Sequence, residues 1–156
     1  MLTLYHAAPS TCSKKIRRSL AEKEIEWTSR HMNLGDKLEN LEPWYQKLNP
    51  NGVVPTLDHD GAIIIESCVI LEYLEDTFPE ISLRPDNTVE RAKMRLWLDK
   101  SEHIAHDNIN LISFRKRFIP RMSKLDPSEV ENIIGRYPNL AMRSKLKHRY
   151  ENGVTD

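Results

Sequence analysis

The chain has 156 residues, 39% of them apolar and 29% charged, which is enough to bury a hydrophobic core in one domain and part of a second. Its 23 basic and 23 acidic residues give a formal net charge of zero, which excludes a general attraction to nucleic acid or to an anionic membrane. No apolar stretch approaches bilayer length, and residues 1–5 lack the basic and apolar regions of a secretory signal. Because Cys12 and Cys68 have neither disulfide-framework nor metal-motif spacing, we expect a cytoplasmic protein in a reducing compartment.

The chain begins with a strand, a helix and a second strand. Residues 2–5 alternate as a short strand, and a helix is predicted over residues 12–24 with Ser10 or Thr11 as its N-cap. Apolar and polar residues alternate again over residues 25–32, which indicates the second strand.

A hairpin follows a short helix and a turn. The helix is expected over residues 41–48, and the Asn-Pro-Asn-Gly sequence at 49–52 is typical of a turn. Two apolar runs at 53–57 and 62–65 are joined through Asp60-Gly61, which predicts an antiparallel pair of strands.

The second strand of this hairpin leads into a helix at Glu66-Ser67, and Pro79 closes that helix. The order of elements in residues 1–82 is therefore β-α-β-α-β-β-α. The apolar residues expected to form the buried stripe of the last helix are Val69, Ile70, Leu74 and Phe78.

Residues 84–87 have the composition of a linker, and the chain beyond them, residues 88–156, is helical in character. A long helix is predicted from 88 to about 118, where no Gly or Pro occurs. Asp126 and Glu129 predict a capping box at the start of another helix, and a last helix is expected from Pro138 to about residue 153. The apolar residues that recur along the long helix are Val89, Leu96, Ile104 and Leu111.

Pro55 interrupts a run that otherwise predicts a strand. Proline cannot donate a hydrogen bond to a sheet, so it indicates an edge, a bulge or a cis peptide bond. The neighbouring Val54 backbone is then available to pair with an extended, peptide-like ligand. The alternative interpretation is an ordinary edge-strand proline.

Two helix starts carry groups suited to anions. At Glu66-Ser67 a strand runs into a helix, where free N–H groups and the helix dipole attract a carboxylate; alternatively Ser67 is a plain N-cap. At residues 10–13 the same dipole favours a thiolate near Cys12. The cations that follow at 14–18 either assist that anion or form a solvated face.

Three stretches occur in an order and spacing that resemble the N-terminal domain of glutathione S-transferases. They are residues 9–17 (PSTCSKKIR), 49–57 (NPNGVVPTL) and 66–74 (ESCVILEYL). The resemblance implies an α/β thioredoxin-like domain over residues 1–82, followed by an incomplete all-α domain. It also implies a cis proline at Pro55, glutathione backbone pairing at Val54, and γ-glutamyl binding at Glu66 and Ser67.

The family's pattern around the reactive thiol varies, so the resemblance offers three candidates. Theta-like and zeta-like enzymes indicate Ser10, beta-like bacterial enzymes indicate Cys12, and bacterial β-etherases indicate Ser13. A serine hydroxyl would lower the pKa of the thiol of bound glutathione by hydrogen bonding, whereas Cys12 would form a mixed disulfide. We favour the serines because conjugation needs a stabilised thiolate and no competing nucleophile.

Two further features bear on ligands. Val53 stands where many relatives carry a Gln or Lys that helps to hold glutathione, so only its backbone contributes here. His103, His106 and Asp107 have the spacing of a metal pair, but no third ligand with suitable spacing accompanies them. The sequence therefore predicts glutathione as co-substrate and no metal.

The region after residue 83 resembles, more loosely, the helical domain of β-aryl-etherase-like bacterial transferases. This implies a small hydrophobic electrophile such as an aromatic ether, with Trp97, His103 and Phe114 lining part of its pocket. The resemblance also implies further core helices beyond Asp156. We therefore expect a truncated product or a domain completed in trans, with a homodimer or another chain covering the exposed apolar surface.

These observations lead to two classes of function. The first is a glutathione S-transferase that activates the glutathione thiol for attack on an electrophile. The second is a non-catalytic module of the same fold that binds glutathione or a protein. A third alternative is glutaredoxin-like thiol exchange through Cys12.

Overall fold

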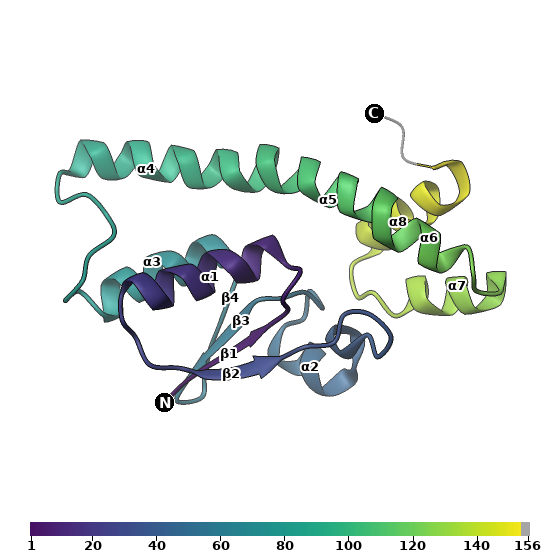
Figure 1. Cartoon of the computed structure of the whole chain (residues 1–156), viewed down its shortest axis with the longest axis horizontal. Coiled ribbons are helices and arrows are strands. Elements are labelled where there is room, and N and C mark those ends of the chain that lie inside the picture. Colours follow the sequence, from purple (N-terminus) through teal and green to yellow (C-terminus); the bar gives the residue numbers. More distant parts are fainter. Residues whose placement is uncertain (154–156) are drawn as a thin grey trace.

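The computed structural model describes residues 1–153, and a four-stranded mixed sheet forms the centre of its first half (Figure 1). The parallel pair is β1–β2, and the antiparallel pairs are β1–β3 and β3–β4. The strands, in the spatial order β2-β1-β3-β4, are β1 (Leu2–His6), β2 (Thr28–His31), β3 (Thr56–His59) and β4 (Ala62–Ile65).

Helices cover both faces of this sheet. The helices α1 (Thr11–Glu22) and α3 (Ser67–Thr77) lie side by side over one face, and α2 (Pro43–Leu48) lies on the other (Figure 1). A single 3₁₀ turn, η1 (Glu39–Leu41), precedes α2. The predicted order β-α-β-α-β-β-α and the thioredoxin-like fold are confirmed.

Two strands begin later than the apolar runs predicted. β2 begins at Thr28, the partner of Thr3, whereas Ile25 and Trp27 pack against the core from the preceding loop. β3 begins at Thr56, directly after Pro55, because proline has no N–H to offer the ladder.

The main core lies between the sheet and the pair α1 and α3. On α3, Ile70 and Leu74 are fully buried and Phe78 packs at the edge, as predicted, but Val69 is 55% exposed. The prediction for Val69 was wrong because adjacent helical residues point about 100° apart, so Val69 turns away when Ile70 faces the sheet. The buried members of this core are Leu2, Leu4, Ile16, Leu20, Leu57, Ile70 and Leu74.

One continuous helix runs from residue 88 to residue 122, along the top of the view in Figure 1. It extends four residues past the predicted end at 118 and passes through Pro120. Two stretches of it are π-helical, and Pro120 lies two residues after the end of the second. Its segments are α4 (Thr88–Lys100), η2 (Ser101–His106), α5 (Asp107–Ser113), η3 (Phe114–Phe118) and α6 (Ile119–Met122).

Two more helices complete the part of the chain that the structure describes. The helix α7 (Pro127–Gly135) starts with the predicted capping box of Asp126 and Glu129. The helix α8 (Leu140–Asn152) starts two residues after Pro138, where the Asn139 side chain accepts a hydrogen bond from the Met142 N–H. The last three positions of the predicted helical region, 154–156, lie outside the described residues. Within residues 1–153, none of the helices combines the length and apolarity required to span a bilayer.

The distal helices, which are η3, α6, α7 and α8, have a core of their own. The apolar stripe predicted on the long helix does not contribute to this core, because Val89, Leu96 and Ile104 are each more than half exposed. Docking onto the sheet domain includes an ion pair between Arg136 and Glu42, whose nitrogen and oxygen are 2.8 Å apart. The buried residues of this second core are Phe114, Met122, Val130, Ile134 and Leu146.

A buried ion pair ties the linker to the sheet domain. Lys23 Nζ, at the end of α1, lies 2.9 Å from Glu75 Oε1 on α3, and both side chains are less than a tenth exposed. Lys23 also donates to the Ile81 carbonyl, while Glu75 accepts from the Leu83 N–H and the Ser82 hydroxyl. The pair therefore fixes the segment that leads out of α3 toward the long helix.

Candidate functional site

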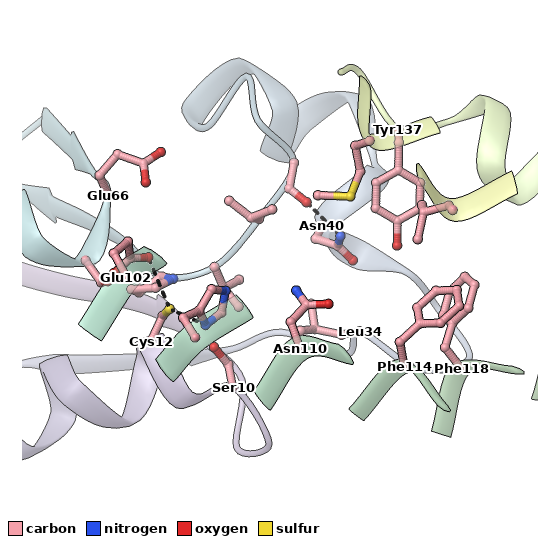
Figure 2. A pocket seen from close by; sticks show the side chains of 18 residues that line it. Ser10, Cys12, Leu34, Asn40, Glu66, Glu102, Asn110, Phe114, Phe118 and Tyr137 are labelled. Carbon is pink, nitrogen blue, oxygen red and sulfur yellow. Dashed lines mark hydrogen bonds between the residues drawn. The ribbon is translucent and has the colours of Figure 1, made fainter. Parts of the chain in front are cut away.

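A cavity of about 340 Å³ lies between the sheet domain and the distal helices (Figure 2). All of the predicted site residues except Ser13 line it. Those residues are Ser10, Cys12, Val53, Val54, Pro55, Glu66 and Ser67. The apolar side chains that the distal helices and the α7–α8 loop contribute are Phe114, Phe118, Tyr137, Met142 and Leu146.

The segment before β3 presents a free backbone edge to the cavity. The Val54–Pro55 peptide bond is cis, and within residues 1–153 no hydrogen bond joins the Val54 backbone to another residue. The Val53 carbonyl, in contrast, accepts from the Tyr45 hydroxyl at 2.7 Å and from Asn49 Nδ2 at 2.9 Å. The two hydrogen bonds to Val53 therefore fix this segment, while the backbone of Val54 stays available to pair with an extended ligand.

The start of α3 has no side-chain cap. Its N-cap residue, Glu66, has a φ of +67°, which residues other than glycine rarely adopt. The Glu66 carboxylate accepts a hydrogen bond from Asn51 Nδ2 at 2.9 Å. Ser67 is only 4% exposed, and its Oγ is buried near Cys12 without a hydrogen-bond partner of normal geometry. A buried hydroxyl without a partner raises the free energy of the folded state unless a ligand forms a hydrogen bond with it. The free N–H groups of the first turn of α3 favour a carboxylate as that ligand.

The two candidate serines near α1 have different environments. Ser10 is the N-cap of α1, and its Oγ accepts from the Ser13 N–H at 3.1 Å, which leaves the hydroxyl proton free to donate. Ser13 is fully buried outside the cavity lining, and its Oγ accepts from the Ala7 N–H. Of the two, only Ser10 faces the cavity.

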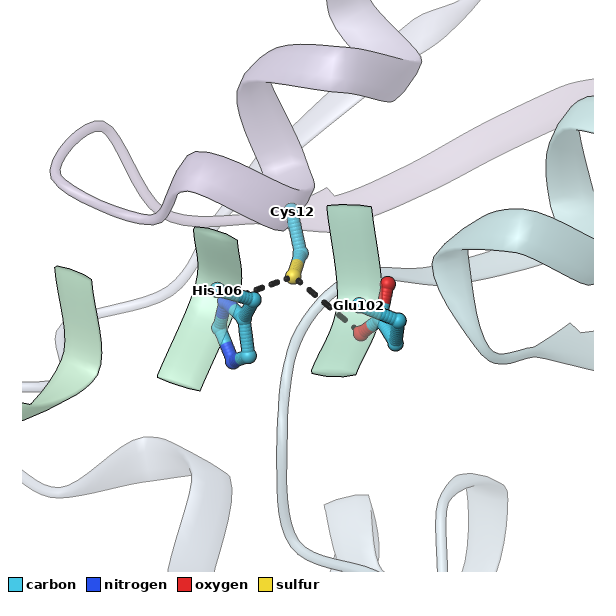
Figure 3. Close-up of side chains that lie close together, drawn as sticks. All are labelled: Cys12, Glu102 and His106. Carbon is cyan, nitrogen blue, oxygen red and sulfur yellow. Dashed lines mark hydrogen bonds between the residues drawn. The ribbon is translucent and has the colours of Figure 1, made fainter. Parts of the chain in front are cut away.

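Cys12, in the first turn of α1, forms a pair with His106 from η2 (Figure 3). Its Sγ lies 3.4 Å from His106 Nδ1 and 4.0 Å from Glu102 Oε1. Burial alone would raise the pKa of the Cys12 thiol, but the hydrogen bond and positive charge of His106 outweigh it, so this pKa lies below its ordinary value. The hydrogen bond to Cys12 in turn raises the pKa of His106. The geometry favours a thiolate–imidazolium pair.

Glu102 connects this pair to a second thiol. Its Oε2 lies 2.9 Å from Lys15 Nζ and 3.3 Å from Cys68 Sγ. Burial would raise the pKa of the Glu102 carboxyl, but the Lys15 ammonium lowers it below the ordinary value. Burial raises the pKa of the Cys68 thiol, so the two cysteines differ in reactivity.

The long helix presents a row of side chains at every fourth position to the cavity, namely Glu102, His106, Asn110, Phe114 and Phe118. In a regular α-helix a spacing of four drifts by about 40° per step, which would turn the row away from the cavity. The π-helical stretches η2 and η3 hold more residues per turn, since their hydrogen bonds span five residues. They keep both the polar and the aromatic ends of the row on one side.

The sequence missed most of this row. Of the three residues expected to line the electrophile pocket, only Phe114 does so. Trp97 is 70% exposed beneath Lys100, and His103 faces outward, 3.4 Å from Asp99. His106 is paired with Cys12 and not with His103. The signal that would have found the row is its four-residue spacing beside a cysteine at a helix start.

The Cys12 pair predicts a measurable pH dependence. In a Cys68→Ser background, alkylation of Cys12 by iodoacetamide is expected to persist to lower pH than for an ordinary thiol, because a lowered pKa keeps the thiolate as pH falls. His106→Ala is expected to move the midpoint of the rate profile up by about one pH unit. His103→Ala, one position from Glu102 on the outer face, is the control and leaves the profile unchanged. An equal shift in both variants would contradict the pairing.

Comparison with known proteins gives a consistent result. The family model described as "Glutathione S-transferase, N-terminal domain" matches residues 4–82. Over 98 residues the chain is 45% identical to Protein LigF of Sphingobium sp. strain SYK-6, and over 93 residues it is 43% identical to maleylacetoacetate isomerase of Dictyostelium discoideum. These alignments cover 62% and 59% of this chain, but 38% and 42% of the relatives.

A solved structure matches over more of the chain. The crystal structure of the beta-etherase LigF from Sphingobium sp. strain SYK-6 superposes with a TM-score of 0.89 and 34% identity, covering 99% of this chain and 64% of that one. The chain therefore spans about two fifths of the length of the curated relatives and under two thirds of the superposed structure.

Proposed function

The chain belongs to the glutathione S-transferase family, and from this premise we propose that it binds glutathione in the cavity and activates its thiol for attack on a small, aromatic electrophile. The observation that carries the proposal is the meeting of a free peptide edge, an uncapped helix start and the α1 N-terminus around one cavity. The alternative is a non-catalytic module that binds glutathione or a protein.

Glutathione fits the sheet-domain side of the cavity by its chemistry. Its central cysteinyl peptide can pair with the Val54 backbone, as a short added strand does. Its γ-glutamyl carboxylate would lie at the start of α3, where the unpartnered Ser67 hydroxyl and the free N–H groups supply donors. Glu66 would attract the γ-glutamyl ammonium group, because its carboxylate faces the same cavity.

In this pose the sulfur of glutathione would reach the start of α1. The Ser10 hydroxyl, which is free to donate, would stabilise the thiolate and lower the pKa of the thiol. The helix dipole favours the same negative charge. Because Ser13 is buried outside the lining, we assign the donor role to Ser10 and not to Ser13.

The apolar end of the cavity would receive the electrophile. Phe114 and Phe118 stack with centroids 4.4 Å apart, and Tyr137 lies across the cavity from them (Figure 2). A second hollow of about 460 Å³ shares Ser10 and Phe114 and continues toward Arg117. Flat aromatic substrates suit these walls, and an aryl ether of the kind that the name beta-etherase denotes is one candidate.

The test measures binding and turnover together. Wild-type protein is expected to be retained on immobilised glutathione and to conjugate glutathione to a chlorodinitrobenzene or cleave an aryl ether. Ser67→Ala is expected to weaken glutathione affinity about tenfold, since it removes one charge-assisted hydrogen bond. Ser123→Ala, at the exposed residue that follows α6, is the control. Retention without turnover would favour the non-catalytic module, and no retention would contradict both.

The Cys12–His106 distance of 3.4 Å favours a second candidate function, thiol–disulfide exchange. The Cys12 thiolate would attack a glutathione mixed disulfide, form a Cys12–glutathione disulfide and release the other thiol, which takes up a proton. A second glutathione thiolate would then attack that disulfide, releasing oxidised glutathione and the Cys12 thiolate. Glutathione is the reductant, so electrons and atoms balance.

We also propose a homodimer in the cytoplasm. The support is the exposed apolar surface on α3 and α4, where Val69, Leu96 and Trp97 are 55%, 62% and 70% exposed. A second copy would remove this surface from water.

A further inference from the structure

Cys12, Glu102 and His106 bring a thiolate, a carboxylate and an imidazole into one cluster (Figure 3). One atom of each lies within 4.8 Å of the others. Glu102 and His106 come from the same side of η2, four positions apart, and Cys12 faces them from α1. We propose that these three side chains form a binding site for a borderline divalent cation of the Zn²⁺ class, with a fourth coordination position open to the cavity.

The separations of the ligand atoms are close to those of a tetrahedral ion. Zinc bonds of about 2.3 Å to sulfur and about 2.0–2.2 Å to nitrogen or oxygen place neighbouring ligand atoms about 3.3–3.6 Å apart. The Cys12 Sγ to His106 Nδ1 distance is 3.4 Å, and the Cys12 Sγ to Glu102 Oε1 distance is 4.0 Å. The third separation, between Glu102 and His106, lies within 4.8 Å, so these two side chains approach each other when the ion binds.

The surroundings are those of a three-ligand site. Cys12 is buried and the other two side chains are half-buried, so the ion would be shielded on the protein side. Glu102 Oε2 accepts from Lys15 at 2.9 Å, which orients the carboxylate and leaves Oε1 toward Cys12. All three ligands line the cavity, so the fourth position faces a water or a thiolate of a bound ligand.

The donor set selects among cations. A thiolate with an imidazole suits Zn²⁺ or Co²⁺, whereas Mg²⁺ requires oxygen ligands. The thiolate and the carboxylate together neutralise a dication, and Lys15 adds one opposing positive charge at the edge of the site.

The test titrates Co²⁺ into the protein and follows the thiolate-to-cobalt charge-transfer absorption, with Zn²⁺ as competitor and Mg²⁺ as a negative control. One Co²⁺ per chain is expected, the band is lost in Cys12→Ser, and His106→Ala and Glu102→Gln each weaken binding by about 100-fold or more. Zn²⁺ is also expected to protect Cys12 from iodoacetamide.

The matched controls are His103→Ala, on the outer face of the same helix, and Cys68→Ser, which removes the other thiol near Glu102; both are expected to leave Co²⁺ affinity unchanged. Absence of a thiolate band in the wild type would overturn the proposal. So would a band that survives Cys12→Ser and disappears in Cys68→Ser, or an unchanged affinity in His106→Ala. None of these readouts depends on transferase activity.

Discussion

Replacing Cys12 with alanine is expected to reduce glutathione-dependent reduction of a mixed disulfide by about 10³-fold or more, because the variant has no thiolate to form the covalent intermediate. Conjugation of glutathione to an aromatic electrophile is expected to continue, since Ser10 and the docking residues remain. The measurement is the rate of oxidised glutathione formation beside the rate of conjugate formation, in the same preparation.

Two further variants separate the roles of the neighbouring groups. Cys68→Ala is expected to keep both activities, because Cys68 contacts Glu102 and is absent from the cavity lining. Ser10→Ala is expected to lower conjugation about 10²-fold while disulfide reduction is retained. If disulfide reduction survived in Cys12→Ala, thiol exchange through this residue would be disproved. If Cys12→Ala lost conjugation together with disulfide reduction, the role of donor to the glutathione thiolate would belong to Cys12 and not to Ser10.

Glu75→Ala is expected to lower the free energy of unfolding by about 3–5 kcal/mol, since it leaves the Lys23 ammonium buried without its partner. The loss also removes the acceptor for the Leu83 N–H and the Ser82 hydroxyl, so the linker should loosen. Urea unfolding followed by circular dichroism measures the change.

A residue on the same helix provides the control. Glu72 forms a partly exposed ion pair with Arg95, and Glu72→Ala is expected to cost less than about 1 kcal/mol. The double variant Lys23→Met with Glu75→Leu should recover most of the lost stability, because an apolar pair of similar size avoids the buried charge. Equal costs for Glu75→Ala and Glu72→Ala would contradict a special role for the buried pair.

Local patterns predicted the sheet domain well. The Asp60-Gly61 turn between two apolar runs, the stop at Pro55 and the capping box at Asp126 each depend on neighbours in the sequence. These signals also located the free edge at Val54 and the helix start at Ser67. What they could not give is which side of a helix meets the sheet, as the exposure of Val69 shows.

The thiol environment could not be predicted in the same way. Cys12 acquires its partners from η2, and the contact with His106 spans 94 positions in the sequence. No local pattern reports a contact of that range, and the π-helical stretches alter the period by which a helix face is recognised. The burial of Ser13 likewise follows from tertiary packing, because its sequence neighbours do not report which side of α1 faces the sheet.

The Cys12–His106 pair joins two helices that lie far apart in the sequence, which has a practical consequence. The pair exists only while the long helix is seated on the sheet domain, and lifting that helix would return Cys12 to an unpaired thiol. The rate at which Cys12 is labelled at mildly acidic pH therefore reports whether η2 is in contact with α1. One native side chain can thus serve as a conformational reporter without any added probe.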